Sequence, residues 1–259
     1  EYIESKWNDG DSFLLRLKDG QTIAARLYEV DTIETHINNT TAARRLRAQR
    51  RYFGIAAYGA RPEPSSQKAI ELGELATAFT QNALAGKPFT IYTSHADARG
   101  GVNNKRIYAF IETSEGKSLA GELVQSGLAR AYGVYRQSPK GLDQDETRER
   151  FKDMELRAAG SRRGIWAFTD WDALPEERLT ERLEEIELSS AVKESKRPPA
   201  DGSINPNTAS KEQLEMIPGI GPSTAQKIID ARPGQVFITP NDLLSISGIG
   251  QRTLEKMQA

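Results

Sequence analysis

The chain has 259 residues, 37% of them hydrophobic, which is enough for one sizeable core and a smaller second domain. Its formal net charge is −1, so no global positive field attracts nucleic acid, and local patches would have to hold such a partner. The absence of cysteine excludes disulfides and cysteine-based metal sites, and two histidines are too few for a zinc site. No apolar run approaches the roughly 20 residues of a membrane span.

Alternating residues predict two strands near the start of the chain, over 12–17 and 22–30. The Asp19-Gly20 pair between them is a strong hairpin signal, so we expect the two strands to be antiparallel. The other elements predicted in this half are strands over 89–93 and 106–112 and helices over 66–85, 119–126 and 145–159.

The most basic stretch of the chain is 41–52, where five arginines fall within eight positions. Two interpretations stay open. The arginines either form the solvated face of a helix or make a strip that contacts substrate phosphates without reading sequence.

Composition changes after Trp171. Residues 175–188 hold six glutamates and predict an exposed, charge-rich helix, and the residues that follow are typical of a linker. The predicted organisation is therefore a first domain over 1–172, a charged helix and linker over 173–202, and a second domain over 203–259.

Carboxylates gather at the predicted hairpin. Because the strands are antiparallel, the start of the first lies beside the end of the second, which brings Asp11 near Asp31 and Glu34. Three carboxylates repel one another unless a cation neutralises them, and oxygen ligands suit Ca²⁺ or Mg²⁺. Arg26 precedes Asp31 by five residues, and its spacing fits both a side chain in the same cavity and an exposed sheet residue.

These motifs resemble the staphylococcal nuclease-like (thermonuclease) family. The resemblance rests on Asp-Gly-Asp-Ser at 9–12, on Arg-Leu-Tyr-Glu-Val-Asp-Thr-Ile-Glu-Thr at 26–35 and on Lys-Arg-Ile-Tyr-Ala-Phe-Ile at 105–111, and it covers roughly 2–171. It implies an α+β fold, an OB-like five-stranded β-barrel with packed helices. It also implies calcium-dependent, sugar-nonspecific endonuclease activity on DNA and RNA, with Mg²⁺ as the alternative cation.

The resemblance further assigns roles to single residues. Asp11 and Asp31 match the calcium-ligating carboxylates, and Thr32 would ligate through its main-chain carbonyl. Glu34 matches the residue that positions or deprotonates the attacking water. The residues expected to contact substrate are Arg26 and Arg106 at the scissile phosphate, and Tyr132 and Tyr135 at the nucleotide.

The chain departs from the family pattern in places. Ile33 stands where a proline is usual, and a common Tyr-Gly pair is missing before Arg106, which leaves Arg99 as a competitor for its role. The segment 38–64 is long for the family and carries the arginine cluster.

The second domain contains an internal repeat. Two Gly-x-Gly segments, at 217–222 and 246–251, each precede a predicted helix, and this pattern resembles the helix-hairpin-helix DNA-binding domain of the bacterial competence DNA-receptor family. The resemblance predicts a small all-α tandem domain whose hairpins offer main-chain N–H groups to DNA phosphates. The residues expected to contact DNA are Gly219, Gly221, Gly248, Gly250, Lys227, Arg252 and Lys256.

Alternatives remain for both domains. The formal charge of 203–259 sums to zero, so contact with another protein is the alternative to DNA binding there. For the whole chain, the alternative to a nuclease is a non-catalytic scaffold that keeps the nuclease fold and binds nucleic acid or protein. Family habit also predicts a secreted or periplasmic protein.

Overall fold

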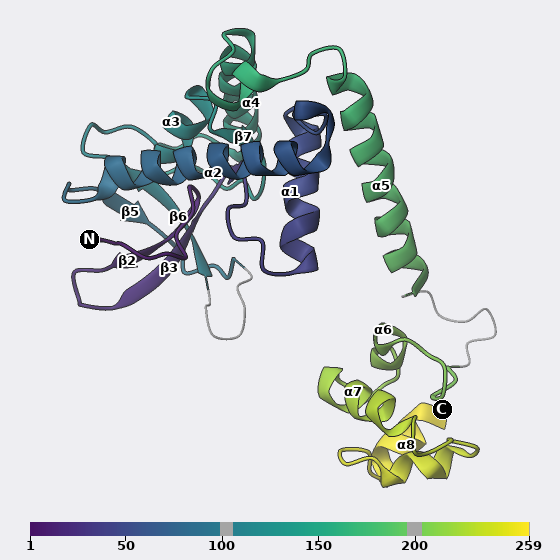
Figure 1. Ribbon diagram of the computed structural model, residues 1–259. Helices are drawn as coiled ribbons and strands as arrows, with labels where there is room; N and C mark the ends of the chain where they lie inside the picture. Colours follow the sequence, from purple (N-terminus) through teal and green to yellow (C-terminus); the bar gives the residue numbers. More distant parts are fainter. Residues whose placement is uncertain (99–105, 196–203, 259) are drawn as a thin grey trace. The chain divides into compact units, whose positions relative to one another are not determined.

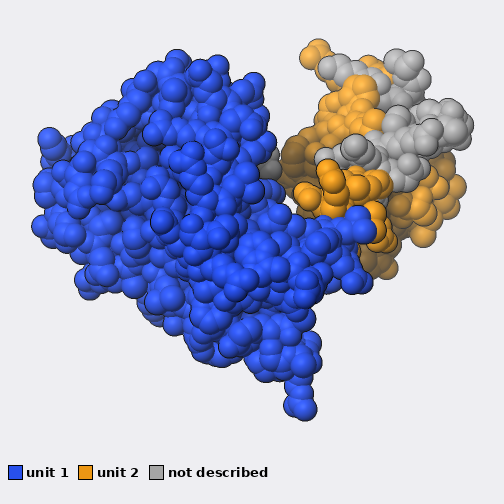
Figure 2. Space-filling view, turned by 90° about the horizontal axis from the view of Figure 1, so that it is seen from above, with its two compact units in different colours: residues 1–181 blue, residues 182–259 orange. Residues whose placement is uncertain are grey.

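The computed structural model describes residues 1–98, 106–195 and 204–258 (Figure 1). The chain divides into two compact units, 1–181 and 182–259, coloured blue and orange in Figure 2. The charged helix α5 (Leu174–Ser195) contributes its first turns to unit 1, where Glu177 accepts hydrogen bonds from the main-chain N–H groups of Ala56 and Ala57. Among the described residues, no helix has both the length and the apolar character needed to cross a bilayer.

A five-stranded sheet organises unit 1, in the order β1-β2-β3-β6-β5. Strands β2 and β3 form the predicted antiparallel hairpin, and β3 pairs with β6 in parallel. The turn at Gly20 has a φ of +86°, which favours glycine. This curled sheet with helices packed on it confirms the predicted α+β, OB-like fold. The strands are β1 (Tyr2–Ile3), β2 (Ser12–Arg16), β3 (Thr22–Leu27), β5 (Thr90–Tyr92) and β6 (Arg106–Glu112).

The prediction of one strand over 22–30 is wrong at its end, because β3 stops at Leu27. Glu29 has a φ of +77°, a left-handed conformation that turns the chain. Beyond that turn, β4 (Val30–Thr32) pairs with β7 (Ala129–Ala131) in a separate two-stranded sheet. Strand propensity continues to Val30, but it carries no information about this change of partner.

Helices α1 to α4 accompany the sheet, and in Figure 1 α2, α3 and α4 lie above its strands while α1 lies beside them. The second is the longest, and Gly86 follows it with a φ of +65°, as expected for a residue that ends a helix. The fourth begins at a reciprocal capping box between Asp143 and Glu146. Short 3₁₀ segments lie at Tyr58–Ala60 and Gly164–Phe168. The helices are α1 (Thr40–Tyr52), α2 (Pro62–Leu84), α3 (Leu119–Gln125) and α4 (Gln144–Gly160).

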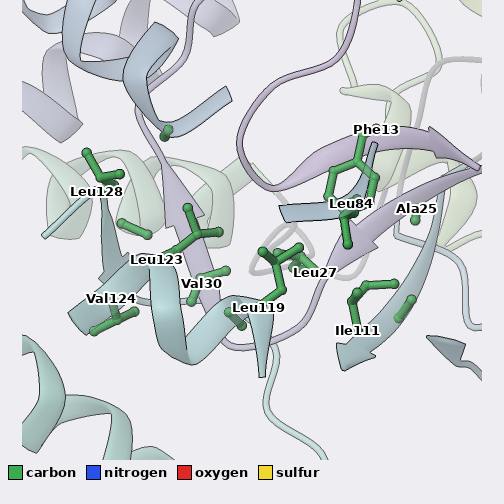
Figure 3. Close-up of a cluster of buried hydrophobic side chains, with 14 of the residues drawn as sticks. Phe13, Ala25, Leu27, Val30, Leu84, Ile111, Leu119, Leu123, Val124 and Leu128 are labelled. Atoms are coloured by element: carbon green, nitrogen blue, oxygen red, sulfur yellow. The ribbon is translucent and has the colours of Figure 1, made fainter. Parts of the chain in front are cut away.

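Two buried clusters hold unit 1 together. The larger one joins the sheet to the helices and includes Phe13, Leu27 and Leu123 (Figure 3). The second cluster packs Leu46 of α1 and Phe53, the residue that caps its end, against α2 and the Trp166 segment. Burial of large apolar side chains contributes roughly 1.5–3 kcal/mol each, so this second cluster fixes α1 firmly beside β4.

Unit 2 has a small core of its own, which includes Leu214, Ile228 and Leu254. Its helices are short, as predicted for a tandem helix-hairpin-helix domain. The elements are α6 (Lys211–Glu215), α7 (Pro222–Ala231), a 3₁₀ segment (Pro240–Ser245) and α8 (Gln251–Gln258).

Candidate active site

Arg26 lies at the centre of the carboxylate cluster. Its pairing with Ser12 across the hairpin places its side chain beside the start of β2. Nη1 contacts Asp11 Oδ1 and Nη2 contacts Asp31 Oδ1, each at 2.9 Å, and the side chain is 12% exposed. Arg26 is therefore not an exposed sheet residue. Burial alone would lower the pKa of Arg26, but the carboxylates of Asp11 and Asp31 raise it above its ordinary value, so the guanidinium stays charged.

Asp31 is a carboxylate on which four side chains converge. Its Oδ1 accepts hydrogen bonds from Arg26 and from Arg45 at 3.2 Å, and its Oδ2 accepts from Gln49 at 2.8 Å and Arg130 at 2.9 Å. Burial alone would raise the pKa of Asp31, but the guanidinium groups of Arg130, Arg26 and Arg45 hold it well below its ordinary value. Asp31 thus stays ionised although it is buried.

Asp11 ties the two sheets together. Its Oδ2 accepts a hydrogen bond from the main-chain N–H of Thr32 at 2.9 Å, which links the start of β2 to β4. Its Oδ1 accepts from the Ser12 hydroxyl at 3.0 Å. Asp9 Oδ1 in turn accepts from the main-chain N–H groups of Asp11 and Ser12. Burial, reinforced by the charge of Asp11, raises the pKa of Asp9.

Glu34 lies at the edge of the same cluster. Its Oε1 contacts Arg45 Nη1 at 2.5 Å, and its side chain is 13% exposed. Burial raises the pKa of Glu34, and the charge of Arg45 opposes that rise. A carboxylate whose pKa is raised toward neutrality is better suited to accept a proton at physiological pH.

Arg106 begins β6 and also reaches the cluster. Its Nη1 donates to the Ser12 hydroxyl at 3.3 Å, the same oxygen that Arg26 contacts at 3.2 Å. The two predicted phosphate-binding arginines therefore share a hydrogen-bond partner, although they come from different strands. Arg99, the competitor for the second role, lies outside the described residues.

The sequence did not point to Gln49, which is fully buried. Its Nε2 donates to Asp31 Oδ2 and to the carbonyl of Thr32 at 2.7 Å, and its Oε1 accepts from the main-chain N–H of Glu34 at 2.8 Å. One side chain thus fixes three positions of the site. The available signal was a polar residue on the apolar face of α1, four residues before Phe53 and three after Leu46.

Arg130 was also missed, and it is the cross-strand neighbour of Asp31 in the β4–β7 pair. Its side chain is 12% exposed and contacts Asp31 Oδ2 through both Nε and Nη2. Because β7 is three residues long and, within the described residues, pairs with β4 alone, the sequence pattern gave no sign of this neighbour.

The arginine cluster of α1 does not form one continuous strip. Arg45 contacts Asp31 and Glu34, whereas Arg50 donates to Ser65 and to a main-chain carbonyl of α2. Arg51 pairs with Glu181. Arg45 therefore reaches the site and Arg50 and Arg51 make structural contacts within unit 1, while Arg44 and Arg47 are exposed.

The two predicted nucleotide-contacting tyrosines differ in exposure. Tyr132 is 50% exposed, and its ring lies under the guanidinium of Arg130 at 4.0 Å. Tyr135 is 8% exposed and packs against Phe151, and its hydroxyl donates to the carbonyl of Glu29 at 3.3 Å. Of the two rings, that of Tyr132 is open to a solvent-borne nucleotide.

The oxygen donors of the site suit a hard cation in type. They are the carboxylates of Asp11 and Asp31, which flank one guanidinium, and the carbonyl of Thr32. In the part of the chain that the structure describes, however, no three acidic or imidazole side chains converge on one point. Glu34 engages Arg45 instead of completing a three-carboxylate cluster. The site thus offers Ca²⁺ or Mg²⁺ the oxygen ligands that these cations prefer, namely two carboxylates and one carbonyl.

In unit 2, the hairpin of each repeat packs against the helix of the other repeat. A side chain at Gly219 would meet Thr253 of the second repeat, and one at Gly248 would meet Thr224 of the first. The two glycines have φ angles of +93° and +107°, so the backbone favours glycine at both, and the close approach of Thr253 also favours it at Gly219.

Other residues predicted to contact DNA lie at the same hairpins. Gly221 is the N-cap of α7, and no heavy atom lies within 4 Å of a side chain added at Gly221 or Gly250. Lys227 donates to the carbonyl of Ser247 at 2.9 Å, and Arg252 is exposed. The side chain of Lys256 lies outside the described residues.

Comparison with known families agrees with this geometry. Residues 24–168, more than half of the 259 residues, match the family described as staphylococcal nuclease homologue. The chain belongs to this family. Residues 200–259 match the helix-hairpin-helix motif family. Both resemblances inferred from the sequence are confirmed, and the nuclease homologue match includes Arg26, Asp31, Glu34 and Arg106.

A curated relative resembles only the second domain. ComE operon protein 1 of Bacillus subtilis (strain 168) is 42% identical to this nuclease homologue over 57 residues. The match covers 22% of this chain and 28% of that protein, so the chain spans little more than a quarter of its relative.

Proposed function

We propose that the chain is a calcium-dependent endonuclease that hydrolyses phosphodiester bonds of DNA. The observation that supports this most is the position of Arg26, which contacts Asp11 and Asp31 and shares the Ser12 hydroxyl with Arg106. Two guanidinium groups beside two carboxylates suit a site for a phosphate and a divalent cation. Membership of the nuclease homologue family supports the same reaction class.

The proposed chemistry follows from charge. In-line attack on a phosphodiester increases negative charge on the phosphoryl oxygens, and groups that bind this charge more tightly in the transition state accelerate the reaction. Arg26 and Arg106 are suited to this task because a guanidinium stays protonated and donates two parallel hydrogen bonds to phosphate. In the resting protein Arg26 contacts Asp11 and Asp31, so substrate phosphate competes with them for its N–H groups.

Glu34 would accept a proton from the attacking water or hold that water in line. Its raised pKa favours proton transfer near neutral pH, and Gln49 fixes the backbone from which its side chain projects. Asp11, Asp31 and the carbonyl of Thr32 are the groups that would hold the cation. When bound, Ca²⁺ would supply positive charge at the phosphate and a template for the reacting groups.

The test is hydrolysis of single- and double-stranded DNA, with an RNA oligomer as a further substrate, in Ca²⁺, in Mg²⁺ and in EDTA. We expect DNA cleavage with Ca²⁺, none with EDTA, and a loss of about 100-fold or more in Glu34→Gln. Glu149→Gln, on the exposed face of α4, is the matched control. Absence of cleavage with either metal would favour the non-catalytic scaffold, and full activity of Glu34→Gln would contradict the role of Glu34.

We further propose that unit 2 binds DNA without sequence preference. Its two hairpins carry glycines whose surroundings are open, next to helix N-termini that favour phosphate. The resemblance to one region of ComE operon protein 1 and the match to the helix-hairpin-helix motif support this role. Export from the cell stays a prediction from family habit.

A further inference from the structure

A cavity of 340 Å³ lies in unit 1 apart from the carboxylate cluster. Its wall is largely apolar and includes Tyr92 of β5, Phe110 of β6, and Phe151 and Met154 of α4. None of the residues proposed for catalysis or cation binding lines it. Its volume lies within the range of small-molecule sites, and its aromatic wall suits a flat, ring-containing ligand.

Two side-chain oxygens of residues that line this cavity are buried and have no hydrogen-bond partner in the described part of the chain. They are Oε1 of Glu29 and Oγ1 of Thr147, and each residue is 2% exposed. An unpaired polar atom in such a place costs about 1–3 kcal/mol, more for a charged group. Both oxygens accept hydrogen bonds, so a ligand that presents N–H donors would remove this cost.

The position of Glu29 is held by its own backbone. Its N–H donates to the carbonyl of Val134, and its carbonyl accepts from the main-chain N–H of Tyr132 at 3.0 Å and from the Tyr135 hydroxyl. The chain turns there with a φ of +77°. The backbone that carries the Glu29 side chain is therefore held in place, and no cation is paired with its carboxylate among the described residues.

Three cationic side chains, Lys117, Lys140 and Arg150, line the cavity together with Glu112 and Glu122. Lys117 and Lys140 are more than half exposed, and each already pairs with a glutamate. Arg150 is exposed and also lines the cavity, and it has no ion pair within the described part of the chain. An anionic group on the ligand would therefore find a guanidinium that has no competing carboxylate.

We propose that this cavity binds a nucleoside monophosphate. The base would pack beside Tyr92 and Phe110 with its N–H edge toward Glu29 and Thr147, and the phosphate would contact Arg150. A hydrocarbon ligand would leave both buried oxygens unpaired, and a simple amine would make no use of Arg150. The site does not depend on the proposed cleavage reaction, because it shares no residue with the catalytic cluster.

Isothermal titration of the full chain with GMP in EDTA tests the proposal, because guanine offers two adjacent N–H donors. Ribose 5-phosphate tests the phosphate alone, and we expect it to bind at least tenfold more weakly than GMP. Glu29→Met, Thr147→Val and Arg150→Ala are each expected to weaken GMP binding about tenfold. Arg157→Ala, an exposed arginine on the same helix that does not line the cavity, should bind GMP as the unmutated chain does.

A variant of the catalytic cluster separates the two sites. Arg26→Lys is expected to bind GMP with unchanged affinity, whether or not the unmutated chain cleaves DNA. Absence of GMP binding to the unmutated chain would overturn the proposal and leave a cavity that holds only water. Binding that is lost in Arg26→Lys but kept in Glu29→Met would place the nucleotide at the catalytic cluster and also overturn it.

Discussion

Glu29 is buried with no counter-charge among the described residues, and burial raises its pKa to about 7 from 4.5. The folded protein therefore binds a proton more tightly than the unfolded chain does, so stability falls as pH rises from about 4.5 to about 7. At one pKa unit per 1.36 kcal/mol, the loss amounts to about 3 kcal/mol.

Glu29→Gln should abolish most of this pH dependence, because its amide does not ionise. Urea unfolding of both proteins at pH 5 and pH 8 measures the effect. The unmutated chain should be less stable at pH 8 than at pH 5, and the variant should be the more stable of the two at pH 8. Equal slopes of stability against pH in both proteins would contradict the burial of an unpaired carboxyl.

Arg45 contacts Glu34 and lowers its pKa against the effect of burial. Arg45→Ala removes that charge, so the pKa of Glu34 should rise and the acid limb of the profile of kcat/KM against pH should move to higher pH. Arg44→Ala, one residue earlier on an exposed position of α1, should leave the limb in place. If the acid limb of the kcat/KM profile stays at the same pH in Arg45→Ala, Glu34 is not the group that titrates in that limb.

At the scale of elements, α1 shows what sequence reasoning could and could not reach. The arginines of 40–52 are evident in the sequence. Periodicity, however, cannot tell which arginine of a basic helix contacts Asp31, which lies 14 residues before Arg45 in the chain. Arg45 and Gln49 reach Asp31 because Leu46 and Phe53 dock α1 into the second core. That docking depends on long-range packing, which no local pattern encodes.

The strands lead to the same lesson. Asp-Gly at 19–20 encodes its hairpin locally, so the closeness of Asp11 to the end of the second strand could be predicted. The turn at Glu29 and the pairing of β4 with β7 join segments about 100 residues apart in sequence, and they bring Arg130 to Asp31. The one local sign of this turn in the sequence is Glu29, a charged residue within an otherwise strand-like segment.

The hairpins of unit 2 allow a test that separates binding from folding. Gly221→Asp places a carboxylate at the N-cap of α7, where aspartate favours the helix and no neighbouring atom obstructs it. Thermal stability should be kept, whereas affinity for duplex DNA should fall because the new charge repels phosphate. A titration at several salt concentrations should also show a shallower salt dependence. Unchanged DNA affinity would favour protein contact as the role of this unit.

At the scale of the whole molecule, the chain joins a nuclease homologue unit to a separate helical unit through a charged helix. Under the proposed function, such a tether raises the local concentration of DNA at unit 1, so unit 2 can bind weakly and still be useful. Unit 1 contains both of its hydrophobic clusters within 1–181, which supports its independent folding.

Deletion of 203–259 should therefore weaken retention of long DNA while a short oligonucleotide is cleaved at nearly the same rate. Filter binding and a fluorogenic short substrate measure the two effects. Equal retention of long DNA after the deletion would contradict the tethering role, and loss of cleavage on the short substrate would show that the second unit contributes to the catalytic centre itself.

The central claim is that the cluster around Arg26 is a phosphodiester-hydrolysing site, and plasmid cleavage in Ca²⁺ by Arg26→Lys tests it most directly. Lysine keeps the buried positive charge between Asp11 and Asp31 but loses the two-pronged contact with phosphate. We predict a rate reduced by about 100-fold or more, and an unchanged rate for Arg16→Lys at an exposed position of β2. Cleavage by Arg26→Lys at the rate of the unmutated chain would contradict the claim.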